Sequence, residues 1–99
     1  KGDLSVPFDC TITVATVLGD QVGSVVIDIW KSIYANYPPT VADSITASAK
    51  PTLSLAAKSQ DQILSGWNAT VAGGSILRLN IDSISTLTRV ELFLNVTKT

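Results

Sequence analysis

The side chains that could carry out chemistry are few in this chain, and none of them is a histidine. The 99 residues include eight carboxylates, seven lysines or arginines and one cysteine. Without histidine, no Ser-His-Asp triad, Cys-His pair or histidine-ligated zinc site can form. Asp20, Asp43 and Asp61 each stand alone, without the alternating acidic spacing of a calcium loop. The sequence therefore predicts no metal site and no cofactor.

Three other carboxylates are the remaining candidates for acid–base catalysis. Asp28, Asp82 and Glu91 are expected on the outward faces of strands, where a pair could in principle serve glycoside hydrolysis. We favour a structural interpretation, in which they are solvated or paired with nearby basic residues. The sequence thus predicts a protein that is not an enzyme.

Four aromatic residues are candidate contacts for a surface or a glycan: Trp30, Tyr34, Tyr37 and Trp67. They are expected at strand ends or in loops, where flat rings can stack on sugars. In the alternative interpretation, which we favour, the two tryptophans cover the rim of the fold and the two tyrosines fix the Pro38-Pro39 loop.

Composition and charge exclude several other classes of protein. Acidic and basic residues nearly cancel and are scattered singly, so no basic patch is available for nucleic acid. No apolar run approaches the ~20 residues of a membrane-spanning helix.

Cys10 lies in a β-branched run and is expected to be buried rather than reactive. Residues 1–99 are expected to form one domain, and the absence of an initiator methionine favours a longer parent polypeptide.

Hydrophobic alternation predicts an all-β fold. Residues 75–99 contain two successive segments in which apolar and polar side chains alternate. Further strands are predicted over 4–8, 10–18, 24–34, 50–54, 58–64 and 68–71. Glycines in the predicted turn at 19–23 suit positive φ angles, and one helical turn is expected at residues 40–46. Seven to eight short strands predict an antiparallel β-sandwich of jelly-roll type.

Apolar residues on both faces of the second and third predicted strands favour self-association. A two-layer sandwich needs only one buried face per sheet, so the surplus marks a surface for a partner. The candidate interface residues are Val26, Trp30 and Phe93. A ring with three-fold symmetry is favoured. Alternatively, the excursion over residues 35–64 covers this surface within one chain.

Several segments resemble a domain of about a hundred residues found in structural proteins of tailed bacteriophages. They are residues 6–13, 25–31, 37–40, 49–54, 64–67, 88–92 and 96–99. This family often has an acidic residue where Gly74 stands and an aromatic one where Leu79 stands. The resemblance implies a β-sandwich at the C-terminus of a tail-fibre-like or other virion protein, and no residue can be carried over as functional.

The resemblance and the residues together give three hypotheses. The first is a virion structural protein, a tail-fibre or appendage domain that forms a homo-oligomer and also contacts other virion proteins. It would present loops 34–40 and 66–74 to a host surface, including surface glycans. The second is a capsid decoration protein, and the third is a non-catalytic carbohydrate-binding module. The first two place the protein in the virion.

Overall fold

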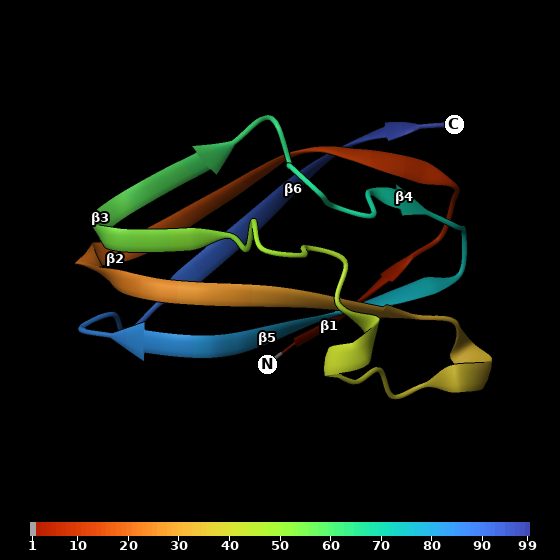
Figure 1. Ribbon diagram of the computed structural model, residues 1–99, viewed down its shortest axis with the longest axis horizontal. Coiled ribbons are helices and arrows are strands. Elements are labelled where there is room, and N and C mark those ends of the chain that lie inside the picture. Colours follow the sequence, from red (N-terminus) through yellow and green to blue (C-terminus); the bar gives the residue numbers. More distant parts are fainter. Residues whose placement is uncertain (1) are drawn as a thin grey trace.

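The computed structural model, which describes residues 2–99, is an all-β protein built on one antiparallel sheet (Figure 1). Its six strands are β1 (Gly2–Val6), β2 (Cys10–Ser32), β3 (Thr52–Asp61), β4 (Thr70–Val71), β5 (Ser75–Ser85) and β6 (Val90–Lys98). Two single turns of 3-10 helix, η1 (Tyr34–Asn36) and η2 (Val41–Asp43), follow β2. The expected all-β class is confirmed.

The 23-residue strand β2 organises the sheet because it bends and takes part in both halves. Its first half pairs with β6 on one side and with the end of β3 on the other. Its second half pairs with β5 and with the start of β3. One half of the sheet thus has the order β1-β5-β2-β3 and the other β6-β2-β3, with β4 beside the beginning of β2. In Figure 1, β2 and β3 both turn back at the same end of the molecule.

The strand count differs from the sequence prediction because two expected turns are bends within continuous strands. Segments 10–18 and 24–34 were expected as separate strands but form β2, with register shifts between Leu18 and Val25. Segments 50–54 and 58–64 largely merge in the same way into β3, which bends at Leu55, where φ is 50°. Among the described residues the sheet therefore contains six strands rather than seven or eight.

The glycines of the β2 bend are required for space, and the expected positive φ at these positions is wrong. Positive-φ glycines in the described chain are Gly66 and Gly74. A Cβ on Gly23 would lie 2.7 Å from Leu87 Cγ and 2.8 Å from the carbonyl oxygen of Ser85. The bend is thus packed directly against the connection between β5 and β6.

Asp20 holds that connection in place. Its carboxylate accepts hydrogen bonds from the Thr88 hydroxyl, from the Thr88 N–H at 3.2 Å and from the Arg89 N–H at 3.2 Å. The Asp20 N–H in turn donates to the Arg89 carbonyl at 3.1 Å. The residue that looks isolated in the sequence therefore joins the bend of β2 to the start of β6.

The core lies between the two halves of the sheet in two clusters. The larger cluster comprises Cys10, Ile12, Ala15, Ile29, Ile45, Leu64, Val71 and Leu77. The smaller comprises Val17, Val25, Ile27, Leu53 and Leu87, close to the bend. Cys10 is buried in the first cluster, as its β-branched neighbourhood predicts.

The expected helical turn is present as η2, and η1 was missed. The Asp43 carboxylate accepts the Thr40 N–H at 2.9 Å, which satisfies one of the free donors at the start of the turn. The strand predicted to reach Tyr34 ends at Ser32, and Tyr34–Asn36 forms the first 3-10 turn, η1.

We expect Gly23→Ala to destabilise the protein by about 1–3 kcal/mol, because the added methyl group would force Leu87 and the backbone at Ser85 apart. Chemical denaturation followed by tryptophan fluorescence measures the change. Gly2→Ala is the matched control, since its Cβ would meet nothing within 4 Å. Equal stabilities of the two variants would contradict the packing described for the bend.

Candidate functional site

The two loops that the sequence singles out, 34–40 and 66–74, contribute to one hollow at an end of the sheet, lined by polar and apolar groups. The hollow has a volume of about 350 Å³. Its walls are formed by Lys31, Ser32, Ile33, Asn36, Asp43, Thr70, Ala72 and Ser75. These residues come from the end of β2, from both 3-10 turns and from the region of β4 and β5, which meet at one end in Figure 1.

The polar groups of this hollow include both hydrogen-bond donors and acceptors. The Lys31 ammonium donates to the Thr70 carbonyl at 2.9 Å and so connects β2 to β4 across the hollow. Asn36 adds an amide and Asp43 a carboxylate. The Ser32 hydroxyl is buried and has no hydrogen-bond partner among the described residues. A wall of this kind can bind a ligand that both donates and accepts hydrogen bonds.

Loop 66–74 is held against the end of β1 and the connection to β2 by hydrogen bonds from its backbone N–H groups. The Gly73 N–H donates to the Asp9 carboxylate at 2.6 Å, and the Gly74 N–H donates to the Val6 carbonyl at 2.7 Å. A Cβ on Gly73 would lie 3.2 Å from Phe8 Cα, so the loop approaches the chain closely at this point. Asp9 is therefore a positioning residue that sequence reasoning missed.

Tyr37 anchors the other loop to the sheet. Its hydroxyl donates to the Asp3 carboxylate at 2.5 Å and accepts from Arg78 Nη2 at 2.7 Å. Arg78 also donates to Asp3 from Nε at 2.8 Å, and its guanidinium lies 5.3 Å from the centre of the Tyr37 ring. The hydrogen bond to Asp3 raises the pKa of Tyr37, so the phenol stays protonated and remains a donor. This contact fixes the Pro38-Pro39 loop.

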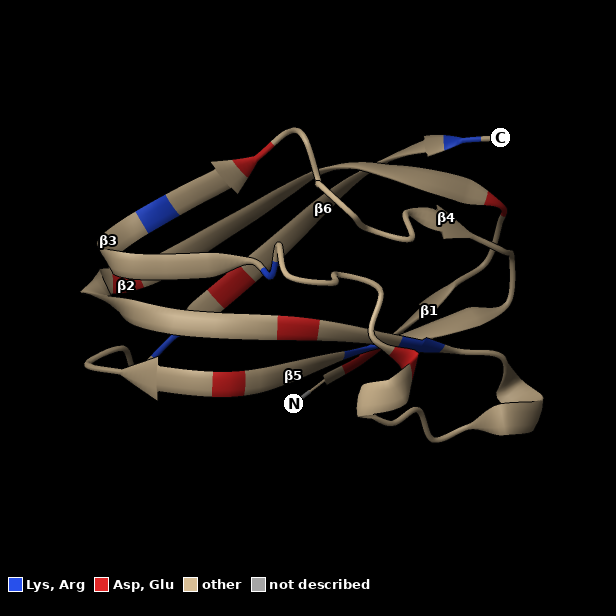
Figure 2. Ribbon diagram, viewed as in Figure 1, with Lys and Arg blue, Asp and Glu red and all other residues tan. Residues whose placement is uncertain are grey.

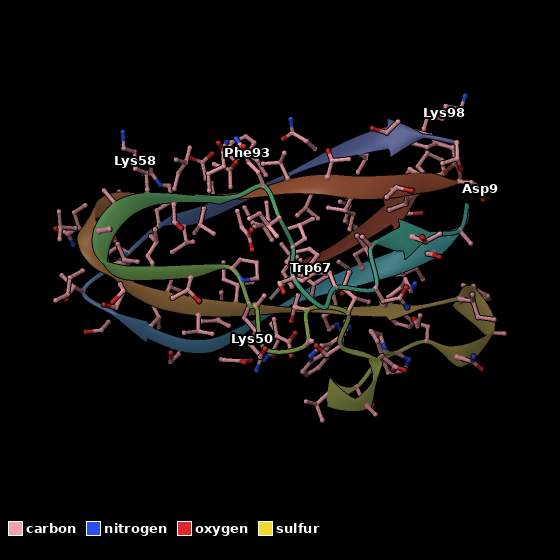
Figure 3. All side chains as sticks on the ribbon, turned by 45° about the horizontal axis from the view of Figure 1, so that its top comes forward. Asp9, Lys50, Lys58, Trp67, Phe93 and Lys98 are labelled. Carbon is pink, nitrogen blue, oxygen red and sulfur yellow. The ribbon has the colours of Figure 1, made fainter. Side chains whose placement is uncertain are left out.

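The two tryptophans are tied into the fold rather than presented as free rings. Trp67 packs against the larger core cluster and donates its indole N–H to the Ala49 carbonyl at 2.8 Å. Figure 3 shows it pointing between the two halves of the sheet. Trp30 is half-buried and donates to the Asp28 carboxylate at 3.0 Å. Of the four aromatic candidates, Tyr34 is the most open, with 85% of its surface exposed.

Asp28 is buried, with 1% of its surface exposed, so its expected position on a solvated outward face is wrong. The carboxylate accepts four hydrogen bonds, from Ser44 Oγ at 2.6 Å, Thr46 Oγ1 at 2.8 Å, Trp30 Nε1 and the Ile29 N–H. Ser44 and Thr46 belong to residues 33–51, the excursion between β2 and β3. The single carboxylate thus attaches that excursion to the central strand.

The ionisation of Asp28 reflects two opposing effects. Burial disfavours the charged form, but the four donated hydrogen bonds stabilise it more, and the pKa of Asp28 is lowered. Lys50 adds a more distant positive charge, 3.9 Å away, while it pairs closely with Asp82 at 2.7 Å. Charged groups elsewhere are scattered along the strands and loops (Figure 2).

The three candidate interface residues occupy two different surfaces. Val26 and Trp30 lie on the second half of β2 and are half-buried. Phe93 lies on β6 with 48% of its surface exposed, and Figure 3 shows it on the outer side of the sheet. Part of the excursion also runs along the edge of β2, where Ile45 N–H donates to the Ile29 carbonyl at 3.0 Å.

Neither metal-binding clusters nor membrane-spanning helices are found in residues 2–99. No three carboxylate or cysteine side chains in this range come together as metal ligands. No helix in the same range is long and apolar enough to cross a bilayer.

Comparisons with known proteins add no identification: no family model, curated protein or solved structure matches the chain.

We expect Asp28→Asn to destabilise the protein by about 2–4 kcal/mol near neutral pH, because buried donors lose their charged acceptor. Urea denaturation at several pH values measures this. Asp82→Asn, which alters a carboxylate in a partly exposed pair, is the control and should cost less.

Comparison of the wild type with Asp28→Asn also tests the direction of the pKa shift of Asp28. A carboxylate with a lowered pKa stabilises the fold above its unfolded-state pKa of about 4, and this contribution is lost as the pH falls through the folded-state pKa. The difference in stability between the wild type and Asp28→Asn should therefore shrink on acidification below about pH 4. A difference that grows with acid would contradict the shift.

Proposed function

We propose that this chain is a non-catalytic structural domain of a virion surface protein, in a tail fibre or a similar appendage. The proposal rests first on the resemblance of segments between Val6 and Thr99 to phage structural proteins. The absence of histidine from the whole sequence excludes catalytic groups that depend on it. The domain acts through self-association and through the loops it presents to a host surface.

The finer description of the fold belongs to the same proposal. We assign the folded sheet to the β-sandwiches of jelly-roll type. The support is that β2 and β3 each pass from one half of the sheet to the other, with the core enclosed between the halves. In sandwiches of this kind, loops gather at the two ends, where they are free to contact partners.

The observation that carries the functional proposal is the hollow between loops 34–40 and 66–74. Its walls combine an ammonium, an amide, a carboxylate and hydroxyl groups, and Tyr34 on the adjacent turn is almost fully exposed. Hydrogen-bonding groups beside an aromatic ring suit a saccharide, whose hydroxyls donate and accept while its ring face stacks. We therefore propose a surface glycan of the host as the ligand of this end.

We expect Tyr34→Ala to reduce binding of the purified domain to host cells and to a glycan array by at least about tenfold, which corresponds to ~1.4 kcal/mol. Ile63→Ala is the matched control, because Ile63 is equally exposed at 84% but belongs to neither of the loops 34–40 and 66–74 that contribute to the hollow. Circular dichroism establishes that both variants remain folded.

Imaging of particles with a tagged domain tests the location. Label on the tail or on an appendage supports the proposal. Label spread over the capsid shell would indicate a decoration protein instead. Glycan binding by the domain, combined with its absence from particles, would indicate a carbohydrate-binding module.

A further inference from the structure

Strand β6 has one free edge, and the middle of this edge, around Phe93, lacks the features that usually protect such strands. Its described hydrogen-bonded neighbour is β2, so the N–H and C=O groups on its other side have no strand partner within residues 2–99. Edge strands are commonly protected by shortness, proline, lysine or a bulge. β1 has five residues and ends before Pro7, and β3 carries Lys58 and a bend. β6 has nine residues without proline, and the bulge in its pairing with β2 places the extra residue on β2. Its charged residues are Glu91 and, at its last position, Lys98, so Leu92 to Thr97 form an uncharged stretch.

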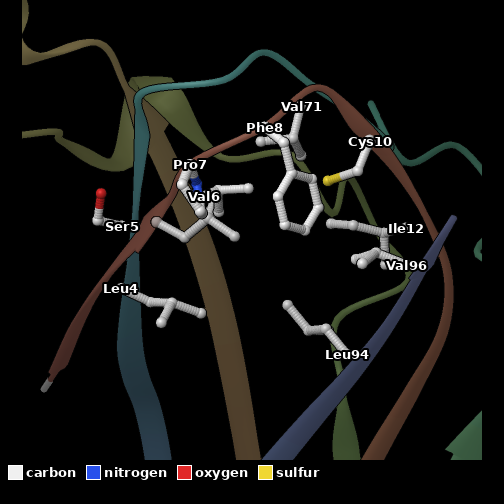
Figure 4. Close-up of a pocket in the computed structure, with 11 residues that line it drawn as sticks. Leu4, Ser5, Val6, Pro7, Phe8, Cys10, Ile12, Val71, Leu94 and Val96 are labelled. Carbon is white, nitrogen blue, oxygen red and sulfur yellow. The ribbon is translucent and has the colours of Figure 1, made fainter. Parts of the chain in front are cut away.

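The inward face of β6 is apolar but incompletely covered. Val90, Leu92 and Leu94 pack against the core clusters and remain half-buried, and Val96 is 43% exposed. Leu94 and Val96 face β1 across an apolar pocket of about 210 Å³ (Figure 4). The pocket is lined by Leu4, Ser5, Val6, Pro7, Phe8, Cys10, Ile12, Val71, Leu77, Leu94 and Val96. None of these side chains is charged, so the pocket suits an apolar group better than a charged one.

The sequence of β6 is self-complementary in the antiparallel direction. Its inward residues read Val90, Leu92, Leu94, Val96, which is the same series in reverse. When two copies pair about Phe93, Val90 lies opposite Val96 of the other copy, and Leu92 lies opposite Leu94. On the outer face the two Phe93 rings lie opposite each other, and no like charges are paired. This is the pattern that a two-fold interface requires, because the same surface serves both subunits.

We propose that β6 pairs with β6 of a second copy of this chain, in an antiparallel register centred on Phe93. The free edges of the two β6 strands join through main-chain hydrogen bonds, and the exposed Phe93 rings cover each other. Val90 and Leu92 of each copy approach Leu94 and Val96 of the other, at the mouth of the pocket beside β1. This inference rests on the self-association in the proposed function and specifies its contact, with two-fold symmetry in place of the expected three-fold ring.

Analytical ultracentrifugation of the chain from micromolar to millimolar concentration tests the assembly. We expect a monomer–dimer equilibrium in which Phe93→Glu raises the dissociation constant about a hundredfold or more, since two carboxylates then oppose each other. Ile63→Glu makes the same kind of change at an exposed residue outside β6 and should leave the equilibrium unchanged. Circular dichroism of both variants separates loss of the dimer from loss of the fold.

Cysteine cross-linking tests the register. In the proposed pairing the Cβ atoms at position 93 lie about 5 Å apart, close enough for a disulfide after small adjustments. Phe93→Cys should therefore cross-link under oxidation. Glu91→Cys should not, because the two copies of residue 91 lie about 13 Å apart along the strand. A Glu91→Cys protein mixed with an Asn95→Cys protein should cross-link again.

Each outcome decides the inference. A dimer that depends on Phe93 and cross-links at position 93 supports it. A trimer overturns the β6 contact. So does a dimer that Phe93→Glu leaves intact and that Phe93→Cys does not cross-link. Either result leaves self-association through another surface possible. A monomer at every concentration overturns both the β6 contact and the self-association of this domain.

Discussion

The buried carboxylate of Asp28 is the constraint on which the candidate site depends. It lies on the central strand, and its four hydrogen-bond donors include Ser44 and Thr46 from the connection between β2 and β3. A buried charge of this kind is tolerated only when its hydrogen bonds are made, so the segment is required where it is found. Because η1 and η2 lie between β2 and Ser44, fixing Ser44 also limits where these turns can go. The hollow is thus bounded by a held segment rather than by a free loop.

A second constraint shapes the opposite end. The bend of β2 needs residues without side chains at the positions that contact Leu87, and Asp20 closes the nearby connection to β6. The bend allows one long strand to contribute to both halves of the sheet. The two ends of β2 therefore take part in different halves of the sheet, and the hollow of the candidate site forms beside the C-terminal end. The free edge of β6 follows from the same arrangement, because one half of the sheet contains β1 and the other has no counterpart to it.

Local alternation predicted the strands well and their connections poorly. The pattern from Leu77 to Val96 indicates which residues face inward, and Leu77, Leu92 and Leu94 all contact the core. The same alternation placed Asp28 outward, and the error arises because its cover comes from Ser44, sixteen residues away. Nothing in the local pattern distinguishes a glycine that turns the chain from one that makes room, as at Gly23. The anchoring of Trp67 to Ala49 and of Tyr37 to Arg78 is equally non-local.

The central claim is that the excursion after β2 is held to the sheet as firmly as a strand, and amide hydrogen exchange tests it most directly. The Ile45 N–H, within the excursion, donates to the Ile29 carbonyl of β2. The Asn68 N–H, from loop 66–74, donates to the Ile45 carbonyl at 2.8 Å and so reports on the other side of the same residue. Exchange at these two amides should be as slow as at the core amides of β2, because all of them open only with the fold. Exchange at the rate of an exposed loop, while β2 remains protected, would contradict the claim.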